Sequence, residues 1–328
     1  MDTSEPRVYG PRAVVKGPPT DRTATSWRLY LILIVPAVGL LEFGAHLVQI
    51  HSGPRDDDWR AAKTFIESQV KPDDLVAVAP RWAEPLAGMH LGPELLTMDR
   101  AARPDESRFP RALEVNMRGA HLPAFAGWAR EGEQRFGDLA VTTWRNPSPA
   151  HVIVDLVAAL GPQTAAVSYV DGDREAACPY GRGSPISGGL GFGPTIPAER
   201  FDCRGRGMVV GVTIVADLDY HPRRCIYAPA PSRGALRIRF SNVRFGTVLH
   251  GFHGLDAEAE RHRQGADVTL KISAGDTWTS SVIHRDGEGW KAFELGTDEL
   301  AGKTEDLIFE VASPGGEGRK YCFTADTR

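Results

Sequence analysis

The stretch 235–240, ALRIRF, alternates apolar and basic residues and indicates the class of fold. A period of two is typical of a strand with one buried face. Further runs of strand type lie around it: MVVGVTIVA at 208–216, VTLKIS at 268–273, TWTSSVIH at 277–284, WKAFEL at 290–295, LIFEVA at 307–312 and KYCFT at 320–324. Because turn-forming residues separate these runs, residues 201–328 are predicted to form an antiparallel β-sandwich.

Residues 56–175 show the pattern of a small α/β domain. Apolar residues at helical spacing in 58–70 predict an amphipathic helix, and the aspartates at 56–58 supply its N-cap and a negative first turn. Residues 81–90 are expected to form a second helix, while 151–160 is ambiguous between helix and strand. The runs of strand type are LVAVA at 75–79, LAVTTW at 139–144 and AAVSYV at 165–170. A strand between helices is the local pattern of an α/β unit.

Residues 176–200 are rich in Gly and Pro and are predicted to link the two domains. Within them, GGLGFG at 188–193 resembles a nucleotide-binding loop. It lacks the strand before, the helix after and the Lys-Ser/Thr pair of a P-loop. We therefore interpret it as part of the linker or of a surface loop.

An apolar run, LYLILIVPAVGLLEFGAHLVQI, occupies 29–50. At about 1.5 Å per residue, a helix of this length crosses a hydrocarbon core of about 30 Å, so a transmembrane helix is predicted. Five basic residues precede it in a Pro-rich leader, 1–28, which is predicted to be disordered, and three aspartates follow it at 56–58. Since basic flanks stay in the cytoplasm, we expect a single-pass cell-membrane protein with its N-terminus inside and its C-terminal domains extracytoplasmic. The expected fold class is thus α+β.

Glu42 and His46 interrupt the apolar run four residues apart, on one helical face. They are interpreted either as the end of the helix, reaching the far interface, or as contacts to the membrane helix of a partner protein. A third alternative is a cleaved signal peptide, with 29–41 as its apolar core, although the 28-residue leader is long for one.

Composition limits the classes of partner. The formal net charge is -4 and the isoelectric point is about 6.2. A nucleic-acid-binding protein is expected to carry a basic face, so this balance argues against nucleic acid as a partner.

All four cysteines, Cys178, Cys203, Cys225 and Cys322, lie in the second half of the chain, and none forms a C-x-x-C pair. An even number on the exported side of a membrane favours disulfides over free thiols. Three full pairings exist, and the spacing alone does not choose between them. The pairing we favour joins Cys178 to Cys203, closing the Gly/Pro loop, and Cys225 to Cys322, tying the two ends of the sandwich.

Short motifs in 56–155 carry a resemblance. They are Asp58-Trp59, Ala61-Ala62, Phe65-Ile66, Pro72-Asp73-Asp74, Val76-Ala77-Val78, Pro80-Arg81-Trp82 and Arg135-Phe136-Gly137. The region resembles the extracytoplasmic domain of bacterial mannosyltransferase-like membrane glycosyltransferases, which use lipid-linked sugars. Those enzymes have many membrane helices and a catalytic acidic loop, which this sequence lacks. The resemblance therefore implies an accessory domain and transfers no catalytic residue.

The strand layout of 201–328 is similar to that of jelly-roll carbohydrate-binding modules. The similarity lies in the LAGKT segment at 300–304 before a strand and in the strand close to the C-terminus. It implies a β-sandwich that binds glycan.

Two groups of polar residues suggest metal or catalytic chemistry. His250 and His253, followed by Glu258 and His262, are the densest set of metal-ligand types. Glycines beside both histidines suggest a turn, so we interpret the set as surface histidines in a loop and predict no metal and no cofactor. Asp217 lies at a strand end and is a weak candidate for an acid catalyst.

Seven residues are candidates for ligand binding. The stretch 222–227, PRRCIY, presents Arg223 and Arg224, whose guanidinium groups bind carboxylate or phosphate, or else it is a strand edge with solvated arginines. An aromatic platform for sugar is the second suggestion, with core packing of the two tryptophans as the alternative. Its members are Tyr227, Trp278, His284, Arg285 and Trp290.

Three functions follow as hypotheses. The first is a membrane-anchored binding module whose sandwich recognises glycan or another envelope component. The second is a glycan-modifying or metal-dependent hydrolase that uses His250, His253 or Asp217. The third is a structural subunit that meets a membrane partner through Glu42 and His46.

Overall fold

The computed structural model describes residues 24–51, 53–187, 194–203, 208–262, 265–316 and 319–328. The segments 1–23 and 188–193, which include most of the predicted leader and the GGLGFG motif, lie outside the described residues. The chain divides into two compact units, Met1–Gly53 and Pro54–Arg328, and each is described by itself.

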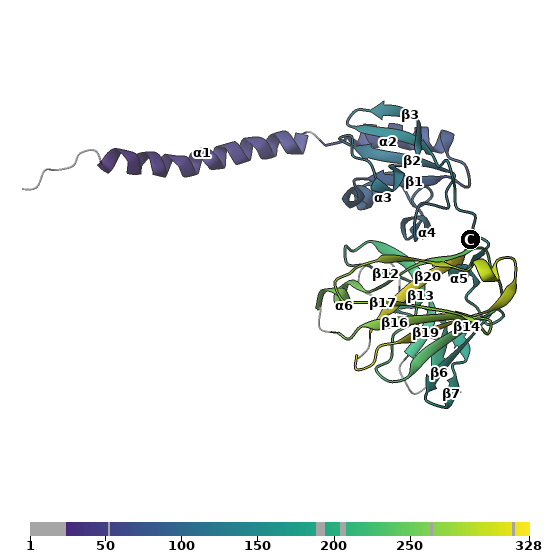
Figure 1. Cartoon of the computed structure of the whole chain (residues 1–328). Helices are drawn as coiled ribbons and strands as arrows, with labels where there is room; N and C mark the ends of the chain where they lie inside the picture. The colour runs from purple at the N-terminus through teal and green to yellow at the C-terminus, as the bar shows by residue number, and fades with distance from the viewer. Residues whose placement is uncertain (1–23, 52, 188–193, 204–207, 263–264, 317–318) are drawn as a thin grey trace, which may run out of the picture. The chain divides into compact units, whose positions relative to one another are not determined.

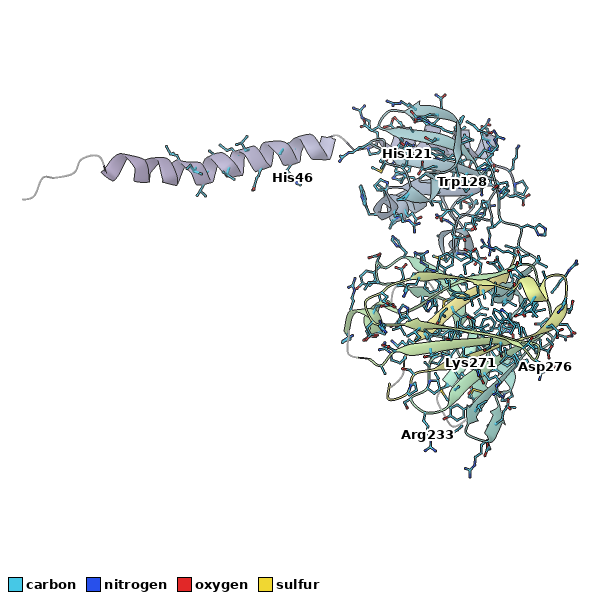
Figure 2. The ribbon with its side chains drawn as sticks, viewed as in Figure 1. His46, His121, Trp128, Arg233, Lys271 and Asp276 are labelled. Carbon is cyan, nitrogen blue, oxygen red and sulfur yellow. A yellow bond between two sulfur atoms is a disulfide. The ribbon has the colours of Figure 1, made fainter. Side chains whose placement is uncertain are left out.

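Helix α1 (Ala24–His51) covers the predicted membrane segment and carries Pro36 within it. Over 33–47 its large apolar side chains are exposed: Leu33, Ile34, Val35, Val38, Leu40, Leu41, Phe43 and Leu47. Glu42 and His46 are exposed as well, and His46 projects from the side of the helix (Figure 2). A search of the described residues finds no helix with the length and apolarity needed to cross a membrane.

The second unit begins with a four-stranded sheet and its helices (Figure 1). The strands are ordered β1 (Leu75–Ala79), β2 (Arg111–Met117), β4 (Leu139–Arg145), β3 (Ala129–Phe136). Strands β1 and β2 are parallel and the other pairs are antiparallel. The predicted strands 75–79 and 139–144 are confirmed as β1 and β4.

Helix α2 (Asp56–Gln69) confirms the predicted amphipathic helix and covers one face of this sheet. Its start is stabilised by the backbone amide of Arg55, which donates to Asp58 Oδ2 over 3.0 Å. Trp59, Ala62 and Ile66 pack against the sheet together with α3 (Glu84–Leu91), which follows the short helix η1 (Arg81–Ala83). The predicted second helix is therefore present as η1 and α3.

Strands β2 and β3 were missed by the sequence analysis. Strand β2 carries the buried Glu114, which breaks its apolar pattern. Strand β3, AREGEQRF, is mostly exposed and shows no apolar alternation. Hydrophobic periodicity does not report strands of these two kinds.

The rest of the unit is a β-sandwich of two antiparallel sheets, as predicted. One sheet is ordered β18 (Lys291–Gly296), β15 (Val248–Leu255), β20 (Tyr321–Thr327), β13 (Pro222–Tyr227), β12 (Met208–Ala216), β11 (Glu199–Cys203), β8 (Tyr180–Arg182), with β5 (Val154–Asp155) beside β20. The other is ordered β17 (Trp278–His284), β16 (Val268–Ala274), β19 (Thr304–Ala312), β14 (Ala235–Arg244), β6 (Ala165–Asp171), β7 (Arg174–Ala177).

The alternation in β14 places its apolar residues in the core between the sheets. Leu236, Ile238 and Phe240 are buried there. The arginines between them point outward, where Arg237 donates to Glu310 over 2.8 Å. One apolar face and one ion-paired face explain why this strand forms part of a two-layer fold.

The sandwich includes segments that the sequence analysis placed elsewhere. Strand β6 lies in the range 56–175 predicted as the α/β domain, yet it pairs with β14. The predicted linker 176–200 contains β8, which pairs with β11, and the small pair β9 (Ile186–Ser187) and β10 (Pro194–Ile196). Sheet membership depends on partners that are distant in sequence, so local composition did not reveal it.

Both favoured disulfides are confirmed. Cys178 bonds to Cys203, and Cys225 bonds to Cys322. The first links the end of β7 to β11, and the second joins the neighbouring strands β13 and β20. Among the described residues no cysteine is free.

The interpretation of His250 and His253 as surface loop residues is wrong. Both lie in β15 and are buried. The glycine between them, Gly251, has no room for a side chain because a Cβ atom there would meet the backbone oxygen of Thr324 and the ring of Phe293. The glycine therefore reflects close packing between strands and not a turn.

Candidate functional site

Two cavities in the second unit share lining residues. Each has a volume of about 250 Å³, and both are lined by Val157 and Arg224. The first lies over β8, β11 and β12, beneath the short helix α5 (Leu156–Ala159). The second continues past β13 and β20 to helix α4 (Met98–Ala101) and the residues that follow it. We call the two together the groove.

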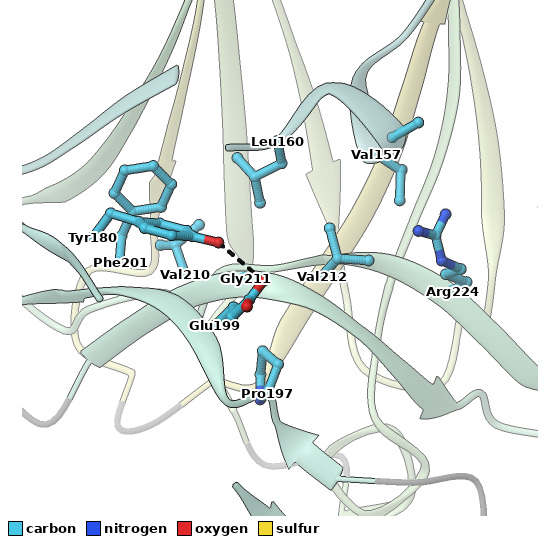
Figure 3. Close-up of a pocket in the computed structure, with 11 residues that line it drawn as sticks. Val157, Leu160, Tyr180, Pro197, Glu199, Phe201, Val210, Gly211, Val212 and Arg224 are labelled. Atoms are coloured by element: carbon cyan, nitrogen blue, oxygen red, sulfur yellow. Dashed lines mark hydrogen bonds between the residues drawn. The ribbon is translucent and has the colours of Figure 1, made fainter. Parts of the chain in front are cut away.

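One end of the groove is aromatic. Tyr180 is 37% exposed, and its ring lies edge-on to Phe201, with 5.0 Å between the centroids. The Tyr180 hydroxyl donates to Glu199 Oε2 over 3.4 Å, as the dashed line in Figure 3 marks. Burial raises the pKa of Tyr180 and the Glu199 charge raises it further, so the hydroxyl remains a donor at neutral pH. This end offers a ring face, a hydroxyl and a carboxylate.

Arg224 lines both cavities, and Figure 3 shows it across Val212 from Tyr180. The backbone amide of Arg224 donates to Ala102 O over 2.9 Å, which joins β13 to the end of α4. Its side-chain Nε lies 3.5 Å from Asp99 Oδ1, and the two side chains are 36% and 79% exposed. Such an exposed ion pair stabilises a fold by at most about 1 kcal/mol, so the guanidinium is available to a competing anion.

Ion pairs form the wall of the second cavity. Arg103 donates to Glu106 Oε1 from two nitrogens, at 3.2 and 2.9 Å. Arg108 lies between Asp155, at 2.9 Å, and Asp326, at 3.6 Å. Burial opposes ionisation of Asp326, but the neighbouring His250 and Arg328 outweigh it and lower the pKa of this carboxyl. These groups are already paired, and they give the groove a rigid polar wall.

Of the seven predicted ligand-binding residues, Arg224 lies in the groove. Arg223 precedes it on β13 and therefore points to the opposite face of the sheet, where its Nε donates to Asp217 Oδ2 over 2.8 Å. Its guanidinium carbon lies 5.8 Å from the ring centroid of Trp290. Trp290 in turn stacks on Phe252 at 6.4 Å.

Of the remaining four, Tyr227 belongs to the apolar cluster that Trp290 packs against, while Trp278, His284 and Arg285 have other surroundings. Tyr227 is buried beside the Cys225–Cys322 disulfide, and burial raises its pKa to about 12. Trp278 is a core residue whose Nε1 donates to Gly296 O over 3.0 Å. His284 is fully buried, and Arg285 is exposed and paired with Asp267.

The predicted catalytic and metal candidates have partners within the protein. His253 Nδ1 lies 2.9 Å from the Tyr321 hydroxyl, and burial lowers the pKa of His253 to about 3. Asp217 accepts from the backbone amides of Asp219 and His221 and so shapes a turn. His262 and Glu258 belong to helix α6 (Ala257–His262). Over the described ranges no group of three or more His, Cys, Asp or Glu side chains is placed to hold a metal ion.

The sequence analysis did not select Tyr180, Glu199 or Asp99. A signal was present for the first two, because both lie between Cys178 and Cys203, and the favoured disulfide holds that segment against the sandwich. No local signal identifies Asp99, since it meets Arg224 only through the tertiary fold.

No protein-family model matches the chain, and no curated protein matches it. Similar solved structures include the carbohydrate-binding module TmCBM61 in complex with β-1,4-galactotriose, with 15% identity, a TM-score of 0.23, and coverage of 35% of this chain and 77% of that one. Another is a structure of CBM51-2 and INT domains of Clostridium perfringens ZmpB with GlcNAc, with 8% identity, a TM-score of 0.25, and coverage of 54% and 40%.

A third is xylanase 10C from Cellvibrio japonicus with xylopentaose, at 10% identity and a TM-score of 0.23, with coverage of 35% of this chain and 24% of that one. Carbohydrate-binding modules are thus among the solved structures similar to this chain. At these identities and TM-scores the similarity does not indicate a function. None of these three is a membrane glycosyltransferase, so the resemblance of 56–155 stays a prediction.

Proposed function

We propose that this protein is a binding module that takes glycan in the groove. The observation that carries this is the combination of an exposed ring, Tyr180, with two hydrogen-bonding groups, the exposed Glu199 and the partly exposed Arg224, along one cavity. A sugar presents C–H faces that pack on an aromatic ring, and its hydroxyls pair with charged side chains. A concave site with a few convergent polar groups is the usual form of a small-ligand site.

The test is binding of a glycan array to the full-length protein in detergent, compared with a Tyr180→Ala variant. We expect the variant to lose about 1 to 2 kcal/mol of binding free energy, because the ring contributes most of the apolar contact area at that end. Tyr220→Ala is a matched control, since Tyr220 is 46% exposed and lies outside the groove residues. Equal binding by both variants would reject the groove as the glycan site.

We further propose that the module works outside the cytoplasm and is attached to the membrane by α1. Two disulfides favour an oxidising compartment. The exposed apolar side chains of α1 need either lipid or a partner helix to cover them. Glu42 and His46, both exposed on α1, are the residues we propose for contact with such a partner. The resemblance of 56–155 to glycosyltransferase domains suggests that this protein assists glycosyl transfer.

A reporter fused after Arg328 tests this topology. An enzyme reporter that requires export should be active, and one that requires the cytoplasm should be silent, because the basic leader holds the N-terminus inside. Neutralising the basic residues of 1–28 should weaken this bias and is the matched control. Activity of the cytoplasmic reporter in the unmodified protein would contradict the proposed location.

A further inference from the structure

The charge distribution of the groove suggests the class of glycan. The second cavity is lined by four arginines, Arg100, Arg103, Arg108 and Arg224, and by three carboxylates, Asp99, Asp155 and Asp326. Two of the arginines are held inside the wall, Arg103 by Glu106 and Arg108 by Asp155 and Asp326. The charged groups outside these pairs are Arg100, Arg224 and Asp99 in the second cavity and Glu199 in the first.

The pair Arg224–Asp99 is loose, while the backbone beneath it is firmly held. The two side chains meet through one contact of 3.5 Å, and the Asp99 carboxylate is 79% exposed. In contrast, the amide of Arg224 bonds to Ala102 O, and Thr97 caps α4 by accepting from the amide of Arg100. The Asp99 side chain can therefore turn into solvent without moving α4 or β13.

A ligand carboxylate would make the contact that Asp99 makes now, and make it better. A guanidinium presents two parallel N–H groups that match the two oxygens of a carboxylate. Asp99 uses a single long contact and leaves that geometry unused. Arg224 lines both cavities, so a molecule whose carboxylate binds there has room to place its next ring toward Val212 and Tyr180.

We propose that the groove binds an acidic saccharide, a uronic-acid unit whose carboxylate pairs with Arg224 in place of Asp99 while an adjoining sugar packs on Tyr180. This assignment rests on the proposed glycan binding and specifies its ligand. Asp99 then acts as an internal competitor that occupies Arg224 when the groove holds no ligand. Displacing it exchanges a weak ion pair for a bidentate one, so the acidic unit gains affinity over a neutral sugar of the same shape.

The experiment compares two ligands that differ only in charge. Titration calorimetry on the full-length protein in detergent uses a trisaccharide of galacturonic acid and the same trisaccharide with its carboxyl groups reduced to alcohols. We expect the acidic form to bind about tenfold more tightly, and the ratio to fall as salt is raised. Asp99→Asn should increase the ratio by removing the competitor, and Arg224→Gln should bring it close to one.

Arg224→Lys keeps the charge and loses the fork, so it should retain only part of the preference for acid. Thermal midpoints of all variants establish that each is folded, and Arg224→Lys replaces Arg224→Gln in the comparison if the latter is not. Equal binding of the two trisaccharides by the unmodified protein would overturn the acidic assignment while leaving glycan binding intact. Failure of both to bind at millimolar concentration would overturn the uronic-acid assignment, and an empty glycan array as well would overturn glycan binding itself. Tighter binding of a sulfated trisaccharide than of the uronic-acid one would overturn the carboxylate preference.

Discussion

The α/β region, residues 54–150, and the sandwich region, residues 154–328, are stabilised by different means. The sandwich has a large apolar core and both disulfides. The α/β region has no cysteine and distributes smaller clusters over the two faces of its sheet. Polar contacts join the regions: Asp105 lies 3.3 Å from Arg328 and 3.6 Å from His250, and the backbone amide of Arg224 donates to Ala102 O. The comparison teaches that covalent and apolar contacts stabilise the sheet that lines the groove, while polar contacts hold α4 beside it.

The largest effect on stability is expected from removing the disulfide that closes the longer loop, Cys225–Cys322. Replacing Cys225 and Cys322 together by Ala should lower the free energy of unfolding of the sandwich by about 4 to 5 kcal/mol, because the bond joins residues 97 apart. The matched pair Cys178 and Cys203, 25 apart, should cost about 3 to 4 kcal/mol. Urea denaturation measures both. If hydrogen exchange showed the α/β region opening together with the sandwich, the two regions would be one cooperative unit and the comparison would fail.

Acid should weaken the sandwich through His253. In the unfolded chain a histidine titrates near pH 6.5, whereas burial lowers the pKa of His253 to about 3. Between these values the unfolded state binds a proton that the folded state does not, so stability falls as pH falls, by about 1.4 kcal/mol per pH unit. The loss between pH 6.5 and 4.5 is then about 2 kcal/mol, because the unfolded histidine is only half protonated at pH 6.5.

His253→Asn should flatten this dependence, and urea midpoints at the two pH values measure it. The Asn side chain can still accept from the Tyr321 hydroxyl, so the difference in pH dependence between the two proteins reports the protonation of His253. Glu260 lies nearby and contacts His284, and the pKa of Glu260 is lowered below its usual value, so its contribution is lost only in stronger acid. An unchanged pH slope in the variant would assign the acid sensitivity elsewhere.

The smallest effect is expected where the two regions meet. Asp105→Asn should lower stability by about 1 to 2 kcal/mol, because the side chain loses its charge toward Arg328 and His250. Faster hydrogen exchange in 99–109, with the sandwich core unaffected, is the expected signature. The difference between the variant and the unmodified protein should shrink in 1 M salt. Equal loss of protection in β14 and β19 would show that the contact is not local.

Several elements were predictable because their signal is local. Helix α2 and strand β14 carry clear periodicity, and strand β1 is a continuous apolar run. Helix α2 and β1 were predicted close to their observed bounds, while β14 extends four residues beyond the predicted 235–240. Strand β15 was not, because Gly251 and Gly254 look like a turn until the neighbouring strands that crowd them are known. Among the predicted ligand-binding residues, Arg224 was selected because a guanidinium group binds carboxylate or phosphate, and it lines the groove. Trp278 and His284 were assigned to the platform as candidates although both are buried.

The sequence by itself determined which segments alternate and that an amphipathic helix lies near 58–70, and it favoured disulfides over free thiols for the four cysteines. These properties depend on neighbours within a few residues or on chemical type, and both can be read from the chain. Only the tertiary structure decided which strands share a sheet and which side chains meet. Tyr180, Arg224 and Asp99 come from β8, β13 and α4 and line one groove because strand order brings them there. Likewise His284 is interior because Glu260, 24 residues away, is buried against it. Contacts of this kind depend on long-range pairing, whose partners no local pattern specifies.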